Sequence, residues 1–192
     1  TVWQDRVYFG ADDGYVYCLA AKDGSVIWNH REGPRDERLL ARGKMISRWP
    51  VRTGVVIHDG IAYYGAGVFP HETVYLVARD ATTGTVVWRN DRISQQDAGR
   101  NPLSPQGYLL ATEAALYFPS GRSRPSAVDR KTGKIRVIAG WRGGSAGETL
   151  NLSSGQVAGA NAVILDGALR TFTLSVVRNR GNVDDAAVQQ QQ

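Results

Sequence analysis

YFGADDGYVYCLAAKDGSVIW, residues Tyr8–Trp28, is the stretch that decides the fold. Three short apolar runs alternate here with two turn clusters; the runs are Val7–Gly10, Tyr15–Leu19 and Ser25–Trp28, and the clusters are Asp12–Gly14 and Lys22–Gly24. Runs of this length that are rich in Val, Ile, Tyr and Phe favour strands. Asp-Gly pairs close hairpins because glycine tolerates a positive φ. The stretch therefore predicts an antiparallel meander.

The meander pattern recurs along the chain. Turn residues directly before a strand-like run occur at intervals of 54, 55 and 52 residues, at Asp5, Asp59, Ala114 and Asp166. A second marker keeps the same phase: turn glycines are followed four positions later by a large apolar residue, in the pairs Gly24 and Trp28, Gly84 and Trp88, and Gly133 and Val137. Two markers in phase indicate a true internal repeat.

Each repeat resolves into four short strands. In the second repeat we predict strands over 52–58, 61–66, 73–79 and 85–88, and in the third over 107–112, 116–120, 126–129 and 134–139. The fourth repeat shows two, over 160–165 and 168–177. A four-stranded meander at a fixed period is typical of a β-propeller blade, and at this period the chain supplies about three and a half blades. We therefore predict an all-β propeller with blades over 1–33, 48–91, 105–140 and 156–180, and a disordered polar tail over 181–192.

The repeat resembles that of the PQQ-like, or quinoprotein-type, propeller family. The family pattern Leu-Asp-Ala-x-Thr-Gly-x-x-x-Trp is similar to residues 19–28, 79–88 and 128–133. The residues that carry the resemblance are Gly24, Trp28, Asp80, Gly84, Trp88, Asp129 and Gly133. Ala20 replaces the usual Asp, Val137 replaces the Trp, and the fourth repeat lacks the motif.

The motif residues have structural interpretations. Asp80 and Asp129 stand four residues before their turn glycines, where a carboxylate can accept hydrogen bonds from turn N–H groups. Trp28 and Trp88 lie on the outermost strands, where a large ring can wedge against the next blade. Burying such a ring contributes about 2–3 kcal/mol from area alone. We expect packing roles for both tryptophans.

The long connections should share one face. Because a meander reverses at every strand, its connections alternate between two rims, and the short Gly-containing turns all fall on one of them. The long connections, over 29–54, 65–73, 89–108, 119–126 and 139–160, fall on the other. Long loops are often functional, so we expect any ligand or partner on this long-loop face. Within it, 36–44 could form a short helix.

Seven residues on the long-loop face are candidate ligand contacts: Arg48, Trp49, Arg52, His71, Arg100, Asn101 and Arg122. An aromatic ring between two guanidinium groups suits a carboxylate, a phosphate or a sugar. The alternative is that Trp49 plugs the propeller channel while Arg48 and Arg52 bind loop carbonyls. His71 lies beside Glu72, which is weak support for acid–base chemistry. We predict no catalytic or metal-binding residue.

Composition narrows the function without deciding it. The chain has 192 residues, a net charge of +5 and one cysteine, Cys18, so it contains neither an internal disulfide nor a cysteine-based zinc site. Its bases are interleaved with acids rather than grouped into a basic arm, which makes nucleic acid an unexpected partner. No apolar run reaches the length of a membrane span. The chain begins with Thr1, and we expect it to be processed or cut from a longer protein.

The resemblance implies two lineages. In quinoprotein dehydrogenases, eight blades hold pyrroloquinoline quinone (PQQ) and Ca²⁺, with paired cysteines and axial acids that we cannot match here. The other lineage is non-catalytic and bacterial, and includes a propeller lipoprotein of outer-membrane β-barrel assembly. It implies a periplasmic or extracellular location.

We favour a non-enzymatic binding or assembly module that presents its long loops to a protein or a small polar or anionic ligand, without a bound cofactor. A fragment of a PQQ-dependent dehydrogenase is the first alternative, with PQQ and calcium bound only in a complete parent propeller. A polyanion binder is the second. An open arc of blades would close through missing blades or self-association, because propellers close with about four to eight blades.

Overall fold

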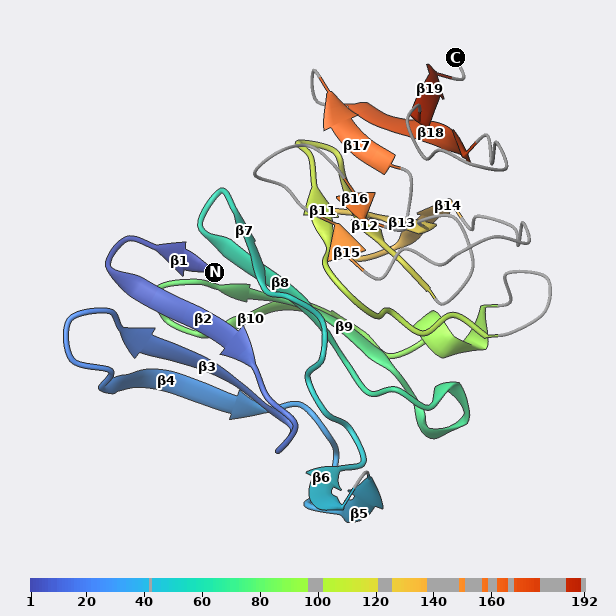
Figure 1. Cartoon of the computed structure of the whole chain (residues 1–192). Helices are drawn as coiled ribbons and strands as arrows, with labels where there is room; N and C mark the ends of the chain where they lie inside the picture. The colour runs from blue at the N-terminus through green and yellow to red at the C-terminus, as the bar shows by residue number, and fades with distance from the viewer. Residues whose placement is uncertain are drawn as a thin grey trace.

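The computed structural model describes residues 1–41, 43–96, 102–120 and 126–137, together with the backbone of five later strands. Three four-stranded antiparallel sheets follow one another along the chain (Figure 1). Among the described residues the helices are two three-residue 3₁₀ turns, η1 (Pro70–Glu72) and η2 (Ile93–Gln95), and neither is long enough to cross a bilayer. The prediction of an all-β propeller is confirmed.

Each sheet is a simple meander, because its strands pair in chain order. The first sheet contains β1 (Val2–Trp3), β2 (Arg6–Gly10), β3 (Tyr15–Ala20) and β4 (Val26–Arg31). The second contains β7 (Val56–His58), β8 (Ile61–Ala66), β9 (Tyr75–Asp80) and β10 (Val86–Asn90). The third contains β11 (Leu110–Ala111), β12 (Ala115–Phe118), β13 (Ser126–Asp129) and β14 (Ile135–Val137). The first strands β7 and β11 are shorter than predicted.

A β-bulge interrupts the fourth strand of each of the three four-stranded sheets at the same place. Cys18 pairs with Trp28 while Leu19 pairs with Val26, so Ile27 is the extra residue. Val87 and Arg136 are the extra residues in the second and third sheets. A bulge bends a strand and re-aims its side chains. In the first two sheets the bulge directly precedes the tryptophan, so the two apolar residues before it face solvent while the tryptophan turns inward.

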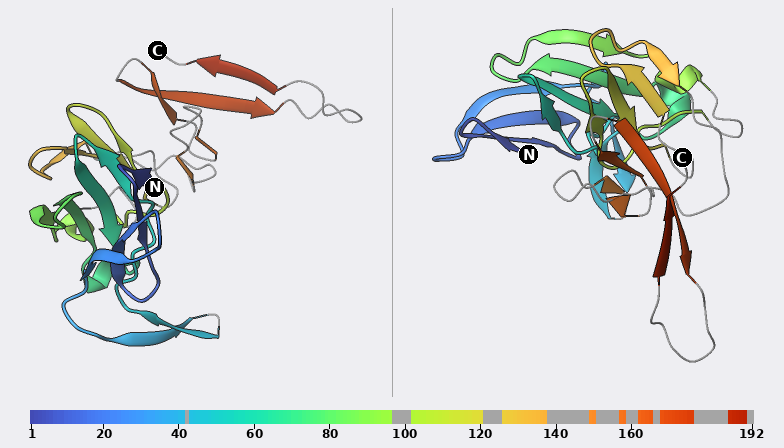
Figure 2. Two further views of the ribbon diagram at one scale, coloured as in Figure 1. Left: turned by 90° about the vertical axis from the view of Figure 1, so that its left-hand side faces the viewer. Right: turned by 90° about the horizontal axis from the view of Figure 1, so that it is seen from above.

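Segment 36–44, for which we predicted a short helix, instead forms part of a β-hairpin, and that prediction is wrong. Strands β5 (Arg38–Ala41) and β6 (Lys44–Ser47) pair directly, and Gly43 has a φ of +75° in the turn between them. The physical reason is that a two-residue turn with glycine favours a hairpin and that Leu39 can pair with Ile46 across it. The hairpin projects away from the blades (Figure 2).

The C-terminal part also departs from the prediction of a disordered tail. Strands β17 (Ala162–Leu165) and β18 (Ala168–Val176) lie where strands were predicted. However, β19 (Ala186–Gln190) pairs with β18 along five residues. The unpaired edge of the long strand β18 offers hydrogen bonds that the apolar run from Ala186 can accept. Along the chain, a separate two-stranded sheet of β15 (Thr149–Leu150) and β16 (Val157–Ala158) comes after the third sheet and before these strands.

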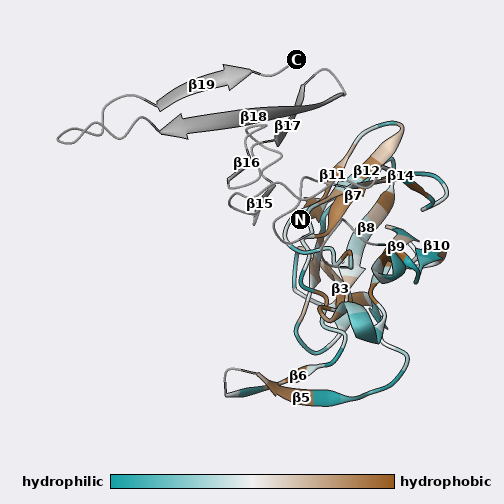
Figure 3. Ribbon diagram, turned by 90° about the vertical axis from the view of Figure 1, so that its right-hand side faces the viewer, coloured by the Kyte–Doolittle hydropathy of each residue, from teal (hydrophilic) through white to brown (hydrophobic). Residues whose placement is uncertain are grey.

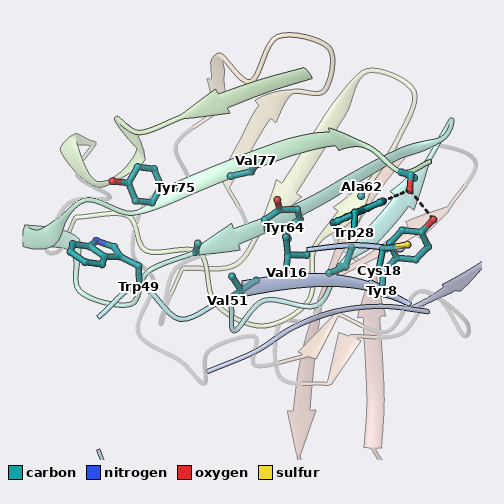
Figure 4. Close-up of a cluster of buried hydrophobic side chains, with 13 residues drawn as sticks. Tyr8, Val16, Cys18, Trp28, Trp49, Val51, Ala62, Tyr64, Tyr75 and Val77 are labelled. Carbon is teal, nitrogen blue, oxygen red and sulfur yellow. Dashed lines mark hydrogen bonds between the residues drawn. The ribbon is translucent and has the colours of Figure 1, made fainter. Parts of the chain in front are cut away.

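Two buried apolar clusters join the blades. One contains Tyr8, Val16, Cys18 and Trp28 of the first sheet with side chains of the second, and the other joins the second sheet to the third. Apolar residues follow the blade strands in Figure 3. Figure 4 shows the first cluster as a long layer between sheets, with Trp49 and Tyr75 at one end and Tyr8, Cys18 and Trp28 at the other.

Each tryptophan of the motif binds the turn of the following blade. The Trp28 indole N–H donates to the Ala81 carbonyl over 3.1 Å, and the Trp88 indole N–H donates to the Arg130 carbonyl over 2.9 Å. Both acceptors stand three residues before a turn glycine. Tyr8 donates a second hydrogen bond, of 3.0 Å, to the Ala81 carbonyl. The expected wedge between blades is therefore present at both described junctions.

The turn glycines make room for these rings. Gly84 and Gly133 have φ values of +75° and +69°. A Cβ on Gly133 would lie 2.5 Å from Trp88 Cε3, and a Cβ on Gly84 would lie 3.0 Å from Trp28 Cγ. At Gly24, which has nearly the same φ of +73°, a Cβ would meet nothing within 4 Å. Glycine at 84 and 133 thus meets two requirements, a left-handed backbone and a close ring, whereas Gly24 meets the first alone.

The motif aspartates cap their turns. Asp80 Oδ1 accepts from the backbone N–H groups of Thr82 and Thr83 at 2.9 and 2.7 Å. Asp129 makes the same bonds one blade later. In the first blade Ala20 replaces this aspartate, yet its carbonyl still accepts the Gly24 N–H at 2.9 Å. The backbone turn therefore keeps its form without the cap.

A buried ion pair lies between the first and second sheets. Glu32 is fully buried, and its Oε1 accepts hydrogen bonds from Tyr64 Oη (2.6 Å) and from Arg79 Nε and Nη2 (3.1 and 3.0 Å). Burial raises the pKa of Tyr64 well above its ordinary value. The pKa of His30 is lowered by burial and by nearby Arg79. Sequence analysis did not predict this cluster, because its members lie up to 47 residues apart.

We predict that the turn aspartates make folding stability depend on pH. The Thr83 N–H lowers the pKa of Asp80, and the Thr132 hydroxyl lowers that of Asp129. A lowered native pKa gives stability that is present above the unfolded value of about 4 and is lost as pH falls through the native value. The double variant Asp80→Asn/Asp129→Asn should therefore lose less stability than wild type between about pH 5 and pH 2 in urea titrations.

Asp91→Asn, which changes an exposed aspartate outside these turns, is the control and should follow the wild-type curve. Parallel curves for wild type and the double variant would show that the caps do not contribute.

Candidate functional site

The long connections form one joined face. In each described sheet the connections between second and third strands lie on the same rim as the links between sheets, as the meander order requires. Backbone hydrogen bonds tie these loops together: Ser47 N–H to Asp12 O, Val51 N–H to Ala11 O, Gly67 N–H to Pro50 O, Gly54 N–H to Gly107 O, and Gln106 N–H to Pro119 O, all between 2.7 and 3.1 Å. The long-loop face is therefore braced by its own backbone.

Arg48 and Trp49 hold the base of the β5–β6 hairpin. The Arg48 guanidinium donates Nε to Glu72 Oε2 at 2.9 Å, Nη2 to Glu72 Oε1, and Nη1 to Glu37 Oε2 at 2.8 Å. These bonds raise the pKa of Arg48 and lower that of Glu72. Trp49 is 4% exposed, and its indole N–H donates to the Glu72 carbonyl at 2.9 Å. Trp49 is thus a buried packing residue, but Arg48 binds carboxylates and not the loop carbonyls that the alternative expected.

Arg52 lies apart from Arg48, on a cleft that opens beside the first strands. Its Nε donates to Asp12 Oδ1 at 2.7 Å, which lowers the pKa of Asp12. The cleft has a volume of about 650 Å³, and besides Arg52 and Asp12 it is lined by Thr1, Thr53 and Tyr108 among others. Tyr108 is half exposed. The structure therefore separates the predicted Arg48, Trp49 and Arg52 trio into a structural pair and one cleft residue.

Of the remaining candidates, His71 is the one among the described residues, and it is not part of the cleft that Arg52 lines. His71 is exposed within η1, and its ring lies 6.0 Å from that of Phe69. Its neighbour Glu72 is engaged by Arg48 rather than by His71. Arg100, Asn101 and Arg122 lie outside the described residues. Tyr108, which sequence reasoning did not single out, is the added cleft residue; its place directly after Gly107 on a long connection was the available signal.

A second charged cluster lies on the opposite rim, where the short turns are. His58, Asp59 and Glu113 present ligand-type atoms within 4.8 Å of one another. Arg130 bridges the two carboxylates, with Nη2 2.7 Å from Asp59 Oδ2 and 3.3 Å from Glu113 Oε1. The guanidinium already supplies the positive charge that a metal ion would bring. We assign this cluster to the junction between the second and third sheets.

Comparison with known proteins places the chain in a family. The family described as outer membrane protein assembly factor BamB matches residues 1–189. The chain belongs to this family. Its repeats are of the PQQ-like propeller type, as the sequence predicted.

Individual relatives fall in both expected lineages. The dehydrogenase subunit of a quinone alcohol dehydrogenase from Komagataeibacter europaeus is 33% identical over 90 residues, which cover 45% of this chain and 11% of that protein. The structure of BamB from Moraxella catarrhalis aligns with a TM-score of 0.54 and 18% identity over 93% of this chain and 52% of that one. The structure of quinohemoprotein alcohol dehydrogenase ADHIIG from Pseudomonas putida HK5 aligns with a TM-score of 0.56 and 16% identity. The alignment covers 92% of this chain and 30% of that one. The chain thus spans only part of each relative.

The described residues do not fit a Ca²⁺–PQQ centre. Calcium takes about six to eight oxygen ligands, usually including several carboxylates. The described lining of the cleft offers one carboxylate, Asp12, and Arg52 already binds it. The one cysteine, Cys18, is fully buried between the first and second sheets and so cannot supply a cysteine pair at the cleft. We therefore derive no step through this cofactor.

We predict different effects for the two arginines. Arg48→Ala should lower the melting temperature, because it leaves Glu37 and Glu72 without their shared cation at the base of the hairpin. Since Arg48 lowers the pKa of Glu72, this stability is present above the unfolded glutamate pKa of about 4 and disappears as pH falls through the native value. The gap between wild type and Arg48→Ala should therefore narrow as the pH falls below about 4 in thermal melts.

Arg52→Ala serves as the matched control, since it removes one exposed pair and should change the melting temperature little. Equal melting of Arg48→Ala and wild type at neutral pH would contradict the bracing role.

Proposed function

We propose that this chain is a non-enzymatic binding or assembly module that presents its long-loop face to a protein partner. The observation that carries the proposal is the backbone bracing of that face, which holds loops from all three described sheets in one arrangement. A surface held in this way loses little conformational entropy when a partner binds. The family's description as an assembly factor supports the same reading.

A location in the periplasm or outside the cell is part of this proposal, because the family is described by outer-membrane protein assembly. We further propose that blades outside this chain, or a second copy, complete the ring. We propose a protein rather than a small anion as the partner, because the braced face extends over loops of all three described sheets and not over a single cleft.

The charge pattern argues against a polyanion partner. Three of the arginines on and between the described blades are held by carboxylates: Arg48 by Glu37 and Glu72, Arg79 by Glu32, and Arg130 by Asp59 and Glu113. Paired guanidinium groups release few counterions when they meet a phosphate backbone. These three guanidinium groups are therefore already engaged and offer little positive charge to a polyanion.

A dehydrogenase fragment is the competing proposal, because 90 residues are 33% identical to a quinone alcohol dehydrogenase subunit. It predicts dye-linked alcohol oxidation once PQQ and Ca²⁺ are added to the purified protein. The assembly proposal predicts none.

Site-specific photo-crosslinking tests the assembly proposal directly. A benzophenone amino acid is placed at Tyr108 or Phe69 on the long-loop face, and at Lys22 or Glu113 on the short-turn rim as matched controls, in cells that make the protein. We expect a discrete crosslinked protein from the first two positions and none from the controls. Crosslinks from the short-turn rim alone, or PQQ-dependent oxidation by the purified protein, would contradict the proposal.

A further inference from the structure

The β5–β6 hairpin has one open strand edge. Glu37 O accepts the Arg48 N–H at 2.9 Å, so these residues form a hydrogen-bonded pair, and such pairs alternate with non-bonded pairs in an antiparallel ladder. The pairs Arg38–Ser47 and Leu40–Met45 are therefore non-bonded, and their N–H and C=O groups point outward from the hairpin. The Ser47 N–H confirms this direction, because it donates outward to Asp12 O at 2.7 Å.

The two edges of the hairpin differ. The β6 edge is closed at Ser47 by Asp12, which belongs to the first sheet. On the β5 edge, the outward groups of Arg38 and Leu40 have no hydrogen-bond partner among the described residues. Figure 3 shows that the hairpin extends from the blades, so its edge is not covered by them. An open edge of this kind is a template for another strand.

The side chains around the open edge are apolar and basic. Leu40 and Met45 are paired across the hairpin and are 71% and 60% exposed, while Ile46, on the other face, is buried. Arg35 and Arg38 have side chains that are 70% and 56% exposed. Their carboxylate partners are exposed or half-buried residues of the same loop, so these pairs are weak and can exchange for others.

We propose that β5 binds an extended strand of a partner protein by strand addition, with acidic side chains of that strand meeting Arg35 and Arg38. The outward N–H and C=O groups of Arg38 and Leu40 provide the backbone bonds, and the exposed Leu40–Met45 pair packs against apolar side chains of the added strand. An alternating apolar and acidic segment has this chemistry. The inference names the binding element on the long-loop face and so rests on the proposed function.

A randomised decapeptide library displayed on its own mRNA tests this inference. It is selected on the whole chain and counter-selected on the variant Leu40→Pro, which removes one outward N–H from the β5 edge. Met45→Pro is the matched control, because it removes one outward N–H and one exposed apolar side chain from the same hairpin, on the other edge. Circular dichroism melts check that both variants fold before binding is measured.

We expect enriched peptides that alternate apolar and acidic residues. Synthetic copies should bind Leu40→Pro about tenfold more weakly than Met45→Pro, because each variant loses one side chain of the exposed apolar pair but only Leu40→Pro also loses about one backbone hydrogen bond to the added strand. N-methylation of alternate backbone nitrogens in the peptide should weaken its binding to the wild-type chain by a similar factor. This measurement does not depend on whether any variant folds.

Several outcomes overturn the inference: no enriched peptide, equal loss with Leu40→Pro and Met45→Pro, or insensitivity to N-methylation. Dimerisation of the chain that Leu40→Pro abolishes in sedimentation would assign the edge to a second copy instead. If photo-crosslinking from Tyr108 still captures a partner, the proposed function stands while strand addition fails.

Discussion

The arrangement of blades depends on one contact, an indole ring laid on a left-handed glycine of the next sheet. At both described junctions the ring fills the space over the glycine and donates its N–H to a carbonyl three residues earlier. Area burial, a hydrogen bond and a steric requirement thus meet at one point. The bulge one residue before each tryptophan turns the ring toward that point. Sheets that are separately simple meanders become a stack with a fixed spacing.

The fixed stack explains why the long loops can share a braced face. Because the sheets are stacked in a fixed arrangement, their long connections lie side by side. Backbone groups that are more than 50 residues apart in sequence, such as Gly54 N–H and Gly107 O, can therefore form hydrogen bonds. At the first junction the fully buried Glu32 adds a charge whose Oε1 is bound by Arg79 and Tyr64, while its Oε2 has no hydrogen-bond partner among the described residues. Removing one partner of a buried pair is far more costly than the pair itself is stabilising. Loss of either Glu32 or Arg79 would therefore be costly at the contact between the first and second sheets.

The sequence was informative where a local pattern repeats. Period, turn glycines and capping aspartates are local features, and they predicted the meanders and the packing role of Trp28 and Trp88. Segment 36–44 was misread because Leu39 and Leu40 with flanking charges fit a helix as well as a strand, and only pairing with Met45 and Ile46 decides between them.

Contacts between distant residues could not be predicted. Arg48 and Arg52 look equivalent in sequence, yet the first binds Glu72, 24 residues away, and the second binds Asp12, 40 residues away. The Glu32–Arg79 pair and the His58 cluster were missed for the same reason: nothing local marks which acid will face which base.

A double-mutant cycle between Trp88 and Gly133, with Gly24→Ala as reference, tests the central contact most directly through unfolding free energies. Gly24→Ala and Gly133→Ala impose the same backbone penalty of about 1 kcal/mol at nearly equal φ, but only the second places a methyl group against a ring. The account predicts that Gly133→Ala destabilises clearly more than Gly24→Ala in wild type and about equally once Trp88→Ala, itself costing about 3–5 kcal/mol, has removed the ring. Additive effects, with Gly133→Ala no worse than Gly24→Ala in either background, would contradict it.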